Sequence, residues 1–172
     1  MSATPGPVRR QLEFLLNGFN FYGHRERVAA DDLLVRSRAG EVLSGAGSRL
    51  DGVVAAWRDR ALGPGVPSAE QLAPLRAAQR TRQRLQDAET MLSASPLAHA
   101  DRTWARLRTE SGVLDLLLQH DLALLGAAQA VRQAADGLRP DALPDGLGAV
   151  DAALERLEDS LRQRGEDLAP PC

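Results

Sequence analysis

The stretch between Pro96 and Pro140 most constrains the fold of this chain. It contains no interior proline over about 40 residues, so nothing interrupts a helix from 97 to 138. At 100° per residue its large apolar side chains cover about 180° of arc, wider than the ~100° stripe of a helix on a protein surface. These side chains are Trp104, Val113, Leu114, Leu117, Leu118, Leu122, Leu124 and Leu125. We therefore expect a helix that other helices contact from at least two sides.

The composition favours an all-α fold. Leu and Ala dominate the apolar residues, Ile is absent, and aromatic residues make up only 3% of the chain. Leu and Ala are strong helix formers, whereas β-branched and aromatic residues favour strands. With 44% hydrophobic and 26% charged residues, 172 residues can form one globular domain with a buried core.

Three further helices follow from apolar spacing and end signals. Alternating steps of four and three predict a helix over 24–62, with Ala39, Leu43, Ala46, Leu50, Val53 and Trp57 forming a heptad-like seam. Ser68 and Gln71 have the spacing of a capping box that opens a helix to 92, in which Pro74 is expected to kink or delay the start. Steps of three and four predict a last helix over 147–168, with Leu147, Val150, Leu154, Leu157 and Leu161 on one face, continuing to Arg164 and Leu168.

The connections are rich in Gly and Pro, and they complete the predicted architecture. Turns are expected at 63–67, 93–96 and 137–148, and a short helix at 7–16 precedes a segment, 17–23, that breaks or kinks the chain. We predict an elongated, antiparallel, coiled-coil-like four-helix bundle with two long helices of about 40 residues and two shorter ones. It spans 7–168 as one domain, between a flexible leader (1–6) and a flexible tail (169–172). Gly40, Gly45, Gly47 and Gly52 either loosen the first long helix or let a neighbour approach it closely.

Three acids fall on apolar faces of the predicted helices. Asp32 lies in the seam of the helix over 24–62, and Glu110 and Asp121 lie inside or beside the arc of the helix over 97–138. A buried carboxylate must be paired or protonated. Two readings follow: a polar pocket in the bundle, or salt bridges that fix helix register, which we favour, with Arg25 and Arg36 as available partners.

Four arginines form a stripe on the helix over 68–92. Arg76, Arg80 and Arg84 recur every four residues with Arg82 beside them, an arrangement that suits contacts to phosphates. No aromatic residue is interleaved, and eight acids from Asp141 onward could satisfy the stripe within the chain. Nucleic-acid binding is therefore the less favoured reading.

The aromatic residues concentrate near the N-terminus. Phe14, Phe19, Phe21 and Tyr22 hold four of the six aromatic side chains, and His24 follows them. Aromatic side chains dominate the energetics of cores and interfaces. Two readings follow: a plug that closes one end of the bundle, or a partner or ligand surface formed by Phe19, Phe21, Tyr22 and His24.

No catalytic, metal or nucleotide signature is present in the sequence. His99 and His120 are 21 residues apart on one predicted helix, about 31 Å, so they cannot share an ion, and both are expected at the surface. The chain has no Lys to complete a P-loop, and its lone Cys172 cannot form an internal disulfide. We expect no enzyme activity, no cofactor and no metal.

The remaining expectations concern location and function. A net charge of −2, no apolar run of ~18 residues and no signal-peptide core predict a cytoplasmic bacterial protein away from membranes. The heptad-like seams favour a non-enzymatic interaction or scaffolding protein that binds a protein partner or self-associates. Because the long helices would outrun the short ones, we expect a homodimer or higher oligomer. The alternatives are nucleic-acid binding through Arg76–Arg84, or a ligand-binding or catalytic bundle around Asp32, Glu110 and Asp121.

Overall fold

The protein is all-α in the part of the chain that the structure describes. The computed structural model describes residues 7–15, 28–63, 66–94 and 111–168. These ranges contain no strand. Their helices are α1 (Pro7–Leu15), α2 (Val28–Ala61), α3 (Ala69–Ser93), α5 (Ser111–Asp136) and α6 (Leu143–Asp167). The predicted fold class is confirmed.

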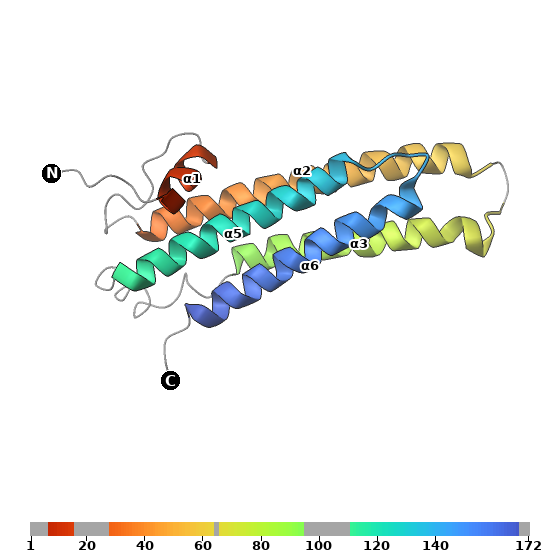
Figure 1. The fold of residues 1–172 in the computed structure, drawn as a ribbon. Coiled ribbons are helices and arrows are strands. Elements are labelled where there is room, and N and C mark those ends of the chain that lie inside the picture. The colour runs from red at the N-terminus through yellow and green to blue at the C-terminus, as the bar shows by residue number, and fades with distance from the viewer. Residues whose placement is uncertain (1–6, 16–27, 64–65, 95–110, 169–172) are drawn as a thin grey trace.

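Four helices lie side by side in an elongated bundle, and α1 packs on α5 at one end (Figure 1). Going round the bundle, α2 contacts α3, α3 contacts α6, α6 contacts α5, and α5 contacts α2. Each helix therefore has two principal neighbours, as the wide apolar arc of the third predicted helix requires.

The bundle consists of two antiparallel hairpins, α2–α3 and α5–α6, which pack with helices of the same direction next to each other (Figure 1). Arg49 on α2 donates a hydrogen bond to the carbonyl of Leu138 just after α5 (3.1 Å). At the other end of these helices Asp32 and Asp121, at the same sequence separation, meet at one arginine. Contacts at a constant separation are those of parallel neighbours. Short connections alone predict the antiparallel hairpins but not this pairing of α2 with α5.

The predicted seams form the core. Ala39, Leu43, Ala46, Leu50 and Val53 of α2 are at most 1% exposed, and Trp57 packs against the same cluster. On α6 the predicted face is also buried, with Leu161 packed beside it; its buried members are Leu147, Val150, Leu154 and Leu157. Helical periodicity therefore identified the core positions correctly.

The helix ends agree with the capping signals and differ at two prolines. Ser68 caps α3: its hydroxyl accepts from the Gln71 N–H (3.2 Å), and the Gln71 side chain accepts from the Ser68 N–H (2.9 Å). The helix begins at Ala69 and contains Pro74, so the expected delay of its start does not occur. α6 begins at Leu143 rather than at the predicted 147, because Pro144 occupies the first turn, where its missing N–H removes no helical hydrogen bond.

Helix lengths are only partly comparable with the prediction. α2 has 34 residues and α3 has 25. The third predicted helix is described from Ser111, for 26 residues, and it ends at Asp136 rather than Leu138; residues 95–110 lie outside the described part. The predicted overhang of this helix involves residues outside the described part, so the self-association inferred from it stays a prediction.

Two of the four α2 glycines let arginine side chains cross the helix. A Cβ at Gly45 would lie 2.1 Å from Arg132 Nη1, and one at Gly47 would lie 3.1 Å from Arg82 Cζ. At Gly40 and Gly52 a Cβ would meet no atom within 4 Å. The close approach expected at these glycines therefore occurs at the middle two.

Candidate functional site

A buried charge cluster joins all four bundle helices at the end where α2 and α5 begin. Arg164 of α6 donates hydrogen bonds to Asp121 of α5 from Nε (3.2 Å) and Nη2 (2.9 Å), and from Nη2 to Asp32 of α2. Arg36 Nη2 lies 2.6 Å from the other Asp32 oxygen, and Arg36 Nη1 donates to the carbonyl of Leu92 on α3 (3.3 Å). Both carboxylates are fully buried.

Opposite charges face each other in this cluster. Its members in the described part of the chain are two carboxylates and two guanidiniums, none more than 6% exposed. Burial by itself lowers the pKa of Arg164, but Asp121 and Asp32 outweigh it and raise that pKa above its ordinary value. Arg164 therefore stays charged at physiological pH. Removing one partner from a buried ion pair of this kind is costly, because the remaining charge stays buried without compensation.

The sequence identified the acids of the cluster better than their partner. Asp32 and Asp121 meet, and Arg36 is a partner; Glu110 and Arg25 lie outside the described residues. The predicted partners did not include Arg164. The spacing does place Arg164 on the buried face of α6, because it continues the apolar seam one step after Leu161.

Two of the four arginines in the stripe pair with acids on neighbouring helices. Arg84 donates to both Glu158 oxygens (3.1 and 3.0 Å) and to Asp151 (3.2 Å), so it joins α3 to α6. The hydrogen bond with Glu158 contributes most to raising the pKa of Arg84, and the nearby Asp151 charge raises it further despite partial burial. Arg82 pairs with Asp51 on α2 (3.2 Å).

Arg76 and Arg80 lie exposed on the same helix. The pairing of the other two arginines leaves these as the accessible cations of the stripe.

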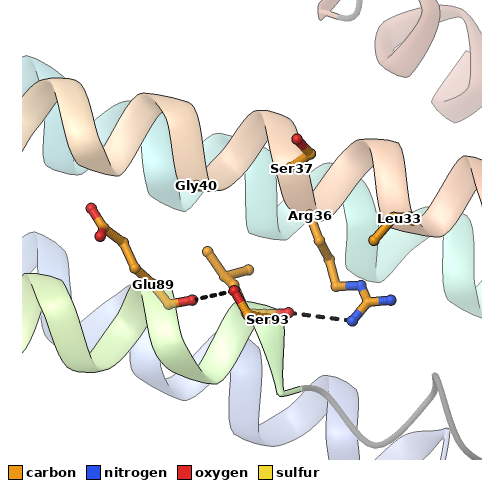
Figure 2. Close-up of a pocket in the computed structure, with 7 residues that line it drawn as sticks. Leu33, Arg36, Ser37, Gly40, Glu89 and Ser93 are labelled. Carbon is orange, nitrogen blue, oxygen red and sulfur yellow. Dashed lines mark hydrogen bonds between the residues drawn. The ribbon is translucent and has the colours of Figure 1, made fainter.

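A groove of about 420 Å³ opens beside the buried cluster, between α2 and α3. Figure 2 shows its lining: Leu33, Arg36, Ser37 and Gly40 on α2, and Glu89, Leu92 and Ser93 on α3. Glu89 Oε1 and Arg36 Nε are buried without a hydrogen-bond partner. No pattern in the sequence singled out this groove, because its lining comes from two helices.

Large apolar side chains are exposed at this same end of the bundle. Leu33 is 62% exposed, Leu34 40%, Met91 45%, and Phe14 of the nearby α1 is 84% exposed. Val66, 99% exposed, lies in the connection at the opposite end. Phe14 is therefore not part of a plug.

The predictions for the aromatic segment and for the histidines have different outcomes. Phe19, Phe21, Tyr22 and His24 lie outside the described residues, as does His99. His120, expected at the surface, is only 9% exposed, because α6 covers it and places Asp167 Oδ2 3.1 Å from its Nε2.

Within the described ranges, no group of three or more His, Cys, Asp or Glu side chains is placed to hold a metal ion. No described helix is both long enough and apolar enough to cross a membrane. Comparison of the chain with protein-family models, curated proteins and solved structures gives no match.

Proposed function

We propose that this chain is a non-enzymatic helical interaction protein that binds a protein partner or another copy of itself. The binding surface is the bundle end defined by Phe14, Leu33, Leu34, Met91 and the groove between α2 and α3; we refer to it as the apolar end. The observation that carries the proposal is that four exposed large apolar side chains lie at this one end of the bundle, where Leu33 lines the groove. Exposed apolar clusters next to polar groups are typical of protein–protein interfaces.

The distribution of charge supports the same function. Two of the candidate acids, Asp32 and Asp121, bind arginines inside the bundle. Two of the candidate arginines, Arg82 and Arg84, pair with acids on neighbouring helices. The seam side chains of α2 are buried by neighbouring helices, so the exposed residues of the apolar end are the ones available to a partner.

Nucleic-acid binding through the arginine stripe is the weaker proposal. Only Arg76 and Arg80 would be available without breaking an ion pair, and exposed acids lie on the same helix at Glu70 and Asp87. Binding to a labelled duplex at two salt concentrations tests it, because phosphate contacts weaken steeply as salt rises.

A site-specific photocrosslinker tests the proposed function. It is placed at Leu33 in one variant and at Val66 in the other, since both positions are exposed and apolar but lie at opposite ends. Each variant is irradiated as purified protein and in extract of its source cells. We expect discrete protein adducts from position 33 and none from position 66.

Equal adducts from both positions, or none from either, would contradict the proposal. Circular dichroism of both variants verifies that the bundle remains folded.

A further inference from the structure

Glu89 lines the groove without a partner of opposite charge among the described residues, whereas the charged side chains near it are paired. In the described part of the chain no cation pairs with it, and its buried Oε1 accepts no hydrogen bond. Farther along the same two helices, Asp51 and Arg82 pair across a smaller hollow of about 270 Å³. Arg36 lines the groove too, but Asp32 and the Leu92 carbonyl already bind it. A buried carboxylate oxygen without a partner is costly, so the groove suits a cationic group.

The outer face of α1 has the complementary chemistry. Arg10 and Phe14 are both exposed, and their spacing of four residues places them on one helix face about 6 Å apart along the axis. No ion pair holds Arg10 within the described part of the chain. Leu12, on the opposite face, is fully buried and anchors α1 to the bundle.

We infer that α1 of a second copy of this chain occupies the groove, with Phe14 against Leu33 and Leu92 and with Arg10 paired to Glu89. This deepens the proposed function and rests on it. The spacing agrees: Glu89 lies about one helical turn from Leu92 along α3, as Arg10 lies about one turn from Phe14 along α1. Figure 2 shows Glu89 and Leu33 at opposite ends of the groove, with Ser93 and Arg36 between them.

The contact is reciprocal. The groove and α1 lie at the same end of the bundle, so each copy can donate its α1 and accept the other, as in a two-fold symmetric dimer (Figure 1). Stable interfaces bury about 1,200–2,000 Å² in total, and reciprocity doubles the area that one α1 would provide.

Charge reversal tests the inference by sedimentation velocity on purified full-length protein. Glu89→Arg alone and Arg10→Glu alone place like charges in both contacts, and we expect each to raise the dimer dissociation constant about tenfold or more. Mixing the two single variants restores opposite charges in both contacts of the mixed dimer. We therefore expect the mixture, and the double variant R10E/E89R, to associate about as well as the original protein.

Phe14→Ser and Val66→Ser form a matched pair, because both replace a highly exposed apolar side chain at opposite ends. F14S should abolish the dimer and V66S should leave it unchanged, with the circular dichroism of both unaltered.

If the original protein is monomeric at up to 100 times the concentrations used for crosslinking, the inference is wrong. It is also wrong if mixing the two single variants does not restore association. Adducts from position 33 in extract but not in purified protein would overturn the second copy and leave the proposed function standing. If position 33 gives no adducts in either extract or purified protein, both the inference and the proposed function are wrong.

Discussion

Arg164→Met tests whether the buried cluster is held together by matched charges. The substitution keeps a long side chain on α6 but removes the guanidinium that contacts both Asp121 and Asp32. Breaking a buried ion pair by removing one partner costs about 3–5 kcal/mol, because the remaining charge is buried and uncompensated. For a protein of this size, such a loss lowers the melting temperature by roughly 6–20 °C.

Urea unfolding followed by the helical circular dichroism signal measures the effect. Arg162→Met is the matched control on the same helix, since Arg162 is 64% exposed and, among the described residues, pairs with the exposed Asp159. We expect R162M to change the free energy of unfolding by less than about 0.5 kcal/mol. The dependence of that free energy on urea should be unchanged in both variants, because the surface exposed on unfolding is the same.

A double variant separates charge from packing. Arg164→Met with Asp121→Leu removes both partners of one ion pair, so the double variant should lose less stability than the sum of the two single losses. If R164M is no less stable than R162M, or if the double variant loses the full sum of the single losses, the charge argument is refuted.

Three further predictions concern local structure. Gly52→Ala should raise the free energy of unfolding by about 0.5–1 kcal/mol in urea titrations, because the added Cβ meets no atom within 4 Å and alanine favours the helix. Ser68→Ala should lower it by about 1 kcal/mol in the same assay, since the hydroxyl that accepts from Gln71 is lost. The hydrogen bond from Arg139 lowers the pKa of Asp141, so its contribution to stability is present above the ordinary aspartate pKa and disappears as pH falls through the lowered value. NMR titration of the Asp141 carboxyl should show that low midpoint, and Arg139→Gln should move it upward.

The sequence by itself determined the helices, their buried faces and most of their ends. These features depend on residues within one or two turns of each other. The steps of three and four through Leu43 and Leu50 specify which face is buried whatever covers it. The capping box at Ser68 is likewise complete within four residues.

Only the tertiary structure decided which helices are neighbours and which charges meet. Asp32 and Arg164 are 132 residues apart. The position of Arg164 on the apolar seam of α6 indicates burial, but not which acids it meets until α6 is placed beside α5. The groove at Glu89 likewise exists only because α2 and α3 run side by side. Helical periodicity makes a side chain face the bundle interior, but the partner it finds there depends on the packing of helices that are distant in the sequence.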